Sequence, residues 1–160
     1  GVHSNGYSLV RKLVEVSGLA WDDPCPWAEG SLGAVLLAPT RLYVTQTLAV
    51  VRAGGVHALA HITGGGLTEN LPRVLPEGMG AAIDLDAWEL PDVFKWLAKT
   101  GGMAEAELLK TFNCGVGMIA VVDAARADAL EAILHDAGET VYRMGHVTDT
   151  AGVAYKGALL

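Results

Sequence analysis

The sequence is poor in the features that mark disulfide-rich, membrane and nucleic-acid-binding proteins. Its two cysteines, Cys25 and Cys114, are far apart and lack a CxxC spacing, so we predict free thiols in a reducing compartment. No apolar run approaches the ~20 residues that cross a bilayer. The net charge is -7, without a cluster of Lys and Arg, which argues against nucleic-acid binding. We therefore expect a cytoplasmic protein with no membrane partner and no nucleic-acid partner.

Several well-known catalytic patterns are missing as well. The chain has no metal-ligand spacing of His and Cys, no order of residues that supports a Ser-His-Asp triad, and no Walker loop. The sequence therefore predicts no metal site and no P-loop for ATP.

The residues that are present favour one domain with a large core. The chain has 160 residues, of which 51% are hydrophobic and only 18% charged, with 20 glycines. This composition is typical of an α/β or α+β domain. The mean hydropathy of +0.34 indicates in addition that a partner covers part of the surface.

The spacing of apolar residues predicts a mixed order of helices and strands. The predicted helices are 7–17, a segment from Thr40 to Gly54, a short one after Gly66, 91–100, 104–111, and a segment from Asp123 to Gly138. The predicted strands are 56–62, 80–85, 116–122, 140–147 and 153–158. This order favours an α/β sandwich with a mixed, partly antiparallel sheet over a doubly wound parallel fold.

Two of these elements carry more detailed expectations. In the second helix, Val44, Leu48 and Val51 form an apolar stripe that we expect to be buried. The continuous apolar run at 116–122 predicts a central strand that is covered on both faces.

The segment from His61 to Asn70 joins a strand to a helix through three consecutive glycines. Glycines allow positive φ angles and a close approach to a ligand, and free N–H groups at a helix start favour an anion. The loop Thr63 to Gly66 is therefore a candidate phosphate site, although many such loops only close a turn. His61 could orient a phosphate or move a proton, or it could simply be a hydrogen-bonded histidine at a strand end.

A second polar segment, His3-Ser4-Asn5-Gly6, stands directly before the first predicted helix. Its side chains and the free N–H groups of the helix start can face a ligand. The alternative is that Ser4 or Asn5 caps the helix and that His3 is a solvated end residue. Cys114 has no nearby base to activate it, so we interpret it as a small buried residue and not as a nucleophile.

Four longer motifs occur in order along the chain: HSNGYSLVRKL at 3–13, LLAPTRLYV at 36–44, HALAHITGGGLTENLPRVLP at 57–76 and TFNCGVGM at 111–118. Together they resemble the C-terminal domain of phosphoribosylformylglycinamidine cyclo-ligase, also called aminoimidazole ribonucleotide synthetase. The resemblance extends to about Val147 and implies a sandwich of three α/β/α layers. It also implies that residues 1–160 are a single C-terminal domain of a two-domain enzyme, without the N-terminal domain that binds ATP and dimerises.

The resemblance implies an ATP-dependent ring closure in de novo purine biosynthesis. Formylglycinamidine ribonucleotide would become aminoimidazole ribonucleotide, with release of ADP and phosphate. The cofactor would be ATP with Mg, bound mainly by the N-terminal domain, and the full-length enzyme would be a homodimer. The residues expected to bind substrate or phosphate are Ser4, Asn5, Gly6, Thr63, Gly64, Gly65 and Gly66. The catalytic candidates are His3, Asn5 and His61.

Two other interpretations stay open. A relative with the same two-domain plan would share the fold, such as formylglycinamidine ribonucleotide synthetase, selenophosphate synthetase, thiamine monophosphate kinase or the hydrogenase maturation dehydratase. The runs NLPRVLP and FNCGVGM favour the cyclo-ligase over these relatives. Alternatively, the chain is an isolated, non-catalytic domain for substrate binding or assembly, because one half of such an enzyme is expected to be inactive alone.

Overall fold

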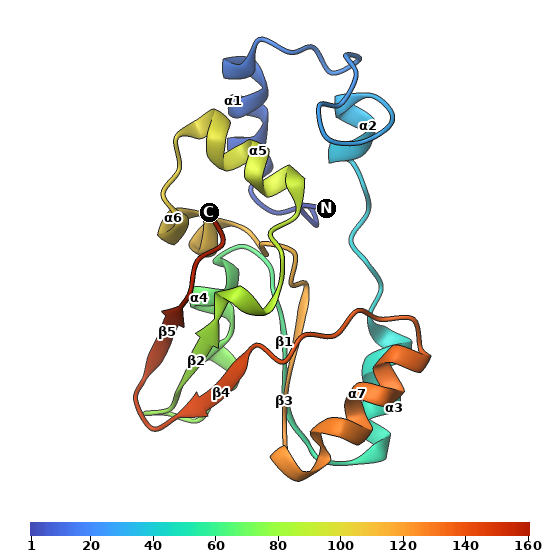
Figure 1. Cartoon of the computed structure of the whole chain (residues 1–160), viewed down its shortest axis with the longest axis vertical. Coiled ribbons are helices and arrows are strands. Elements are labelled where there is room, and N and C mark those ends of the chain that lie inside the picture. Colours follow the sequence, from blue (N-terminus) through green and yellow to red (C-terminus); the bar gives the residue numbers. More distant parts are fainter.

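The expected alternation of helices and strands is present in the structure, a computed structural model that describes residues 1–160 (Figure 1). The helices are α1 (Tyr7–Ser17), α2 (Leu32–Leu36), α3 (Val44–Ala53), α4 (Gly66–Asn70), α5 (Asp92–Gly101), α6 (Glu105–Thr111) and α7 (Ala127–Asp136). The 3-10 turns are η1 (Pro72–Val74), η2 (Leu85–Ala87) and η3 (Ala124–Arg126). The strands are β1 (Val56–His61), β2 (Gly80–Asp84), β3 (Met118–Val122), β4 (Gly145–Thr148) and β5 (Gly152–Lys156). The mixed α/β class is thus confirmed. None of the helices combines the length and the apolar character needed to cross a membrane.

The strands are divided between two sheets. β1 pairs antiparallel with β3, and His61 at the end of β1 lies opposite Met118 at the start of β3. In the other sheet, β2 lies at the centre, antiparallel to β4 and parallel to β5. The pairing is therefore mixed, as expected. The prediction that 116–122 forms a central, doubly covered strand is wrong, because β3 pairs only with β1 and Ile119 is its one buried residue.

The main core lies where α1, α5 and α6 pack against one another (Figure 1). α1 contributes Val10, Leu13 and Val14, which the helical repeat places on one face. Phe94 of α5 and Phe112, which follows α6, are fully buried, and their ring centroids are 5.7 Å apart. This packing gives a firm base to the loops that precede α1 and follow α6.

A second, smaller packing unit consists of α3 and α7, which lie side by side (Figure 1). Each helix contributes one fully buried residue, Val50 from α3 and Leu130 from α7, and neither belongs to the main core. An ion pair between Arg41 and Glu139, with a nitrogen to oxygen distance of 2.9 Å, closes the unit at one end. The β1–β3 ribbon leads from this unit to the rest of the molecule.

The apolar stripe of α3 lies at the surface, which contradicts the expectation that it is buried. The side chains of Val44, Leu48 and Val51 are 65%, 44% and 47% exposed, and Leu42 just before the helix is 81% exposed. The helix contacts α7 instead, and Val50 is its buried residue. Helical periodicity shows which residues share a face, but the face that becomes covered depends on long-range packing. We call Leu42, Val44, Leu48 and Val51 the α3 stripe.

Two neighbouring valines of α3 provide a matched test of this arrangement. Replacing the buried Val50 by Ala should lower the free energy of unfolding by about 1–3 kcal/mol, because buried methyl groups are lost. Replacing Val51 by Ala makes the same change at a half-exposed position, so we expect a shift within about 0.5 kcal/mol. Urea unfolding followed by circular dichroism measures both values. An equal loss for the two variants would show that the α3 stripe is covered in the free chain, contrary to the structure.

Candidate functional site

Three loops that are distant in the sequence meet where β1 ends and β3 begins. The N–H of Ile62 donates to the carbonyl oxygen of Gly117 at 2.9 Å. The side-chain amide of Asn113 donates to the carbonyl oxygen of Gly1 at 3.2 Å. The structure thereby brings the motif at 111–118 together with the chain start and with the motif at 57–76, and all of the predicted site residues lie in the motifs at 3–13 and 57–76.

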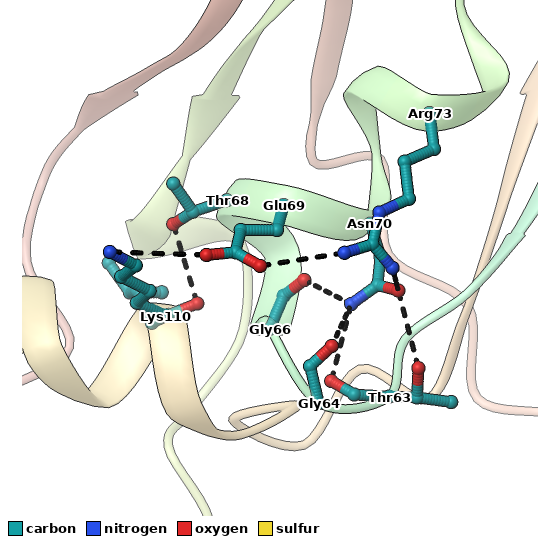
Figure 2. Close-up of polar contacts among 9 residues, drawn as sticks. Thr63, Gly64, Gly66, Thr68, Glu69, Asn70, Arg73 and Lys110 are labelled. Carbon is teal, nitrogen blue, oxygen red and sulfur yellow. Dashed lines mark hydrogen bonds and ion pairs between the residues drawn. The ribbon is translucent and has the colours of Figure 1, made fainter.

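The glycine loop (Thr63–Gly66) is held from one side by the buried side chain of Asn70 (Figure 2). The amide nitrogen of Asn70 donates to the carbonyl oxygens of Thr63, Gly64 and Gly66 at 3.2, 3.1 and 2.8 Å. Its amide oxygen accepts from the hydroxyl of Thr63 and from Arg73, both at 3.2 Å. Asn70 therefore shapes the loop through its backbone, a role that the sequence pattern did not assign to it.

Two backbone donors of the glycine loop are left without a partner. The N–H of Gly66 donates to the carbonyl oxygen of Thr63 at 3.0 Å, whereas the N–H groups of Gly64 and Gly65 donate to no protein atom. Gly64 is exposed, and a Cβ atom added there would meet nothing within 4 Å. Free backbone donors beside open space suit an anion such as phosphate.

The charges around the glycine loop are mixed. A Cβ atom added to Gly65 would lie 2.7 Å from a carboxylate oxygen of Glu69, so one negative charge stands beside the loop. Glu69 in turn pairs with Arg73 at 3.5 Å and with Lys110 at 3.9 Å (Figure 2). These exposed pairs contribute little to stability. The two cations nevertheless offset the carboxylate and leave a net positive charge near the loop.

The segment from His3 to Gly6 forms a strained turn and not a helix cap. His3 and Ser4 have positive φ angles of 51° and 60°, a conformation that costs residues other than glycine roughly 1–3 kcal/mol each. The N–H of Asn5 closes the turn on the carbonyl oxygen of Val2 at 3.0 Å, and the Asn5 side chain donates to the carbonyl oxygen of His3. α1 follows Gly6 without a side-chain cap, so the interpretation of Ser4 or Asn5 as N-cap is wrong. Strain of this kind is concentrated at binding sites.

Three aromatic rings lie in a row between this turn and the glycine loop. The ring centroid of Tyr43 is 6.3 Å from that of His3 and 6.1 Å from that of His61, where the rings meet edge to face. A side chain on Gly117 would collide with the Tyr43 hydroxyl, so glycine is required for the row to form. Burial lowers the pKa of His3, as does a positive charge on His61, and burial raises the pKa of Tyr43. We call His3, Tyr43 and His61 the ring row.

Tyr43 is the member of the ring row that sequence reasoning missed. It lies inside the motif at 36–44, but a single tyrosine before a helix does not reveal what its ring will face. Only the folded chain places the Tyr43 ring between His3 and His61, which are far apart in the sequence.

Cys114 is a buried structural residue, as the sequence predicted. Its side chain is inaccessible, and burial, together with the nearby charge of Glu105, raises the pKa of its thiol to about 12. The thiol contacts two nearby backbone oxygens, those of Leu108 at 3.6 Å and Phe112 at 3.7 Å. Asn113 accepts from the N–H of Gly115 at 2.8 Å and shapes the adjoining turn.

The site therefore combines free backbone N–H groups, which can donate to an anion, with the three rings of the ring row. No group of three or more His, Cys, Asp or Glu side chains is placed to hold a metal ion. Such an arrangement can bind a polyanionic ligand and orient polar groups, but it contains no activated nucleophile. The chemistry that it supports is positioning and electrostatic stabilisation.

The structure is an α/β domain whose candidate site residues lie on loops at the end of a strand pair. The family model for the C-terminal domain of AIR synthase related proteins matches residues 1–157. The chain belongs to this family.

Two solved structures share the fold. Thiamine-monophosphate kinase from Stenotrophomonas maltophilia K279a is 21% identical, with a TM-score of 0.65 over 96% of this chain. HypE, a hydrogenase maturation protein from E. coli, is 20% identical, with a TM-score of 0.58 over 79% of this chain. The chain spans 47% and 41% of these two proteins, so it corresponds to less than half of each.

The glycines of the loop make different demands, which substitution can separate. A side chain on Gly66 would collide with the carbonyl oxygen of Leu109, and its φ angle of 56° is already unfavourable for other residues. We expect Gly66→Ala to lower the free energy of unfolding by at least about 2 kcal/mol. Gly64→Ala, which points into open space, should change it by less than about 1 kcal/mol. Thermal unfolding compares the two variants, and equal stabilities would contradict the close approach of the loop to the C-terminal end of α6.

The burial of Cys114 predicts a slow thiol. In a Cys25→Ser variant, which leaves Cys114 as the only cysteine, we expect iodoacetamide to label the native chain far more slowly than the chain in denaturant. With a pKa of about 12, the thiolate fraction at pH 8 is only about one in ten thousand, and the side chain is enclosed as well. Mass spectrometry over time measures the two rates. Native labelling as fast as that of the unfolded chain would show that Cys114 is accessible.

Proposed function

We propose that this chain is the C-terminal, substrate-side half of a phosphoribosylformylglycinamidine cyclo-ligase. Membership of the family supports the general class. The runs NLPRVLP and FNCGVGM support this particular member. The observation that carries the proposal is the glycine loop. The side chain of Asn70 holds this loop so that backbone N–H groups of the loop stay free, and the loop lies beside the ring row.

In this proposal the glycine loop binds the phosphate of the ribonucleotide substrate. The N–H groups of Gly64 and Gly65 are free to donate to phosphate oxygens, and the hydroxyl of Thr63 lies at the same loop. Backbone donors of this kind bind an anion without a charged side chain. Arg73 and Lys110 add attraction at longer range, while Glu69 opposes it.

The turn at 3–6 and the ring row would receive the part of the substrate that reacts. In the proposed reaction, ATP activates the formyl amide oxygen as a phosphorylated imidate, a substrate nitrogen closes the imidazole ring, and phosphate leaves. The role of this chain would be to position the two reacting ends and to stabilise the charge on the oxygen. The candidates for these contacts are His3, Ser4, Asn5, Gly6 and His61.

No group of three or more His, Cys, Asp or Glu side chains gathers in this chain to hold a metal ion. We propose that Mg-ATP binds mainly to the N-terminal domain of the two-domain enzyme, and we derive no step through it. One half of such an enzyme would be inactive alone.

The α3 stripe supports the proposal that this chain works with a partner. Its four apolar side chains are between 44% and 81% exposed, and the stripe starts directly beside Tyr43 of the ring row. A partner that covers the stripe would therefore also border the site. We propose that this partner is the enzyme's own N-terminal domain, within a homodimer of the full-length enzyme.

A second candidate function is that of a family relative with a different substrate. A thiamine-monophosphate kinase and HypE share the fold, which is why this candidate is considered. The third is an isolated domain for binding or assembly, which the exposed α3 stripe also favours. The identity of the ligand separates these candidates.

An NMR titration of the labelled chain tests the proposal. We expect formylglycinamidine ribonucleotide to shift the amide signals of the loop at 64–66 and of the turn at 4–6, and Mg-ATP to shift them little. Gly64→Glu places a carboxylate in open space beside the free N–H groups, so it should weaken ribonucleotide binding by about tenfold or more. Gly64→Gln has the same size without the charge and should bind within about threefold of the native chain.

The outcomes distinguish the candidates. Loop shifts with thiamine monophosphate, and none with the ribonucleotide, would favour a relative over the cyclo-ligase. No shift with either ligand at millimolar concentration would count against a substrate site that is complete within this chain. Equal affinities of the Glu and Gln variants would show that the glycine loop is not where the phosphate binds.

A further inference from the structure

The two nitrogen atoms of the His3 ring lie in different surroundings. The Nδ1 atom is buried and has no hydrogen-bond partner in the protein. The Nε2 atom also makes no hydrogen bond within the protein, but it is not enclosed in the same way, so it is the ring nitrogen open to solvent. An unpaired polar atom in the interior is uncommon, and it restricts the protonation states that the ring can adopt.

A neutral imidazole carries one N–H and one lone pair, and the enclosed position decides which nitrogen carries the hydrogen. An enclosed N–H without an acceptor loses a whole hydrogen bond, and such groups are rarer in proteins than acceptors that lack a donor. The proton therefore belongs on Nε2, with the lone pair at Nδ1. A charged imidazolium would need an N–H at both positions, so the same enclosure disfavours the charged form.

The surroundings of His3 agree with a neutral ring. Burial is the main cause that lowers its pKa, a positive charge on His61 lowers it further, and no carboxylate is among the groups that act on it. Tyr43 lies on one side as a neutral phenol whose own pKa is raised by burial. No carboxylate is therefore placed to favour a charged His3 ring.

The ring is also fixed in orientation. Tyr43 packs on it at an interplanar angle of 56°. A Cβ atom added to Gly117 would lie 2.9 Å from the Cε1 atom of His3, which stands between the two nitrogens. Tyr43 and Gly117 thus hold the ring with Nδ1 inward and Nε2 outward.

We infer that His3 is held as the neutral Nε2–H tautomer and serves the site as a fixed hydrogen-bond donor, not as a general base. Its ligand would be an oxygen acceptor, such as an amide oxygen or an oxygen that gains negative charge. The only atom of the ring that can accept a proton is Nδ1, and it is enclosed. Tyr43 is then a positioning residue, and His61, which is exposed, is the histidine of the ring row that can exchange protons with a substrate. That the acceptor belongs to a ribonucleotide rests on the proposed function.

The tautomer can be measured without activity. Long-range ¹⁵N–¹H correlation spectra of the ¹⁵N-labelled chain report which nitrogen of each histidine carries hydrogen, and His3→Gln identifies the His3 signals by their loss. We expect Nε2–H for His3 at pH 7, and a ring that is less than half protonated at pH 6.5, where an unperturbed histidine is about half protonated. A His3 ring that carries its proton on Nδ1, or that is protonated at pH 7, overturns the inference.

Variants of Tyr43 test whether this residue fixes the orientation of the His3 ring. Tyr43→Ala should release the ring and give exchange-averaged signals from two tautomers, whereas Tyr43→Phe keeps the packing and should keep the Nε2–H pattern. Tyr142→Ala removes a tyrosine that is 41% exposed and outside the ring row, so it should leave the His3 signals unchanged. An unchanged tautomer in Tyr43→Ala would exclude Tyr43 as the positioning residue.

A ligand experiment separates this inference from the proposed function. Adding formylglycinamidine ribonucleotide should shift the Nε2 signal of His3 in the native chain. His3→Gln, which can place an amide N–H near the position of Nε2, should bind it within about threefold of the native chain, and His3→Ala should bind about tenfold more weakly. If the tautomer is as inferred but the ribonucleotide causes no shift, the proposed substrate is wrong and the tautomer stands.

Discussion

The hydrogen bonds of the Asn70 side chain are the contacts on which the glycine loop depends. One amide group serves three backbone carbonyls with its nitrogen, and its oxygen accepts from Thr63 and Arg73. A buried polar group whose donors and acceptors are all used specifies one conformation, because any other arrangement would leave some of them unpaired away from water. The side chain of Asn70 therefore determines which backbone groups of the loop face a ligand, and it does so without contacting the ligand itself.

The same end of the molecule is built by backbones that pack closer than side chains would allow. Gly6 lies against the ring of Phe112, Gly66 against the carbonyl oxygen of Phe112 at the end of α6, and Gly117 against Tyr43. Each contact joins two motifs that are separate in the sequence. At these positions only a residue without a side chain allows the two segments to approach so closely, whatever its φ angle. These close contacts hold the four motifs together as one site.

The sequence was informative about local structure and less so about packing. Apolar spacing predicted most helices and strands, and the three glycines predicted the loop, because both signals are local. Three features depend instead on segments far away along the chain. They are the exposure of the α3 stripe, the pairing of β3 in a two-stranded sheet and the position of the Tyr43 ring. The role of Asn70 was open for a further reason: a polar residue after a glycine loop can serve the helix start, a ligand or the loop itself, and only the contacts decide.

The junction between the two packing units has a mechanical consequence. Tyr43 directly precedes α3, at its N-cap position, and is also the central ring of the row, so it connects the α3–α7 unit with the site. A small tilt of α3, such as one caused by pressure on its exposed apolar side, would move the Tyr43 ring relative to both histidines. The exposed side of α3 is thus mechanically coupled to the site. A partner that contacts α3 there can change the positions of the rings without contacting them.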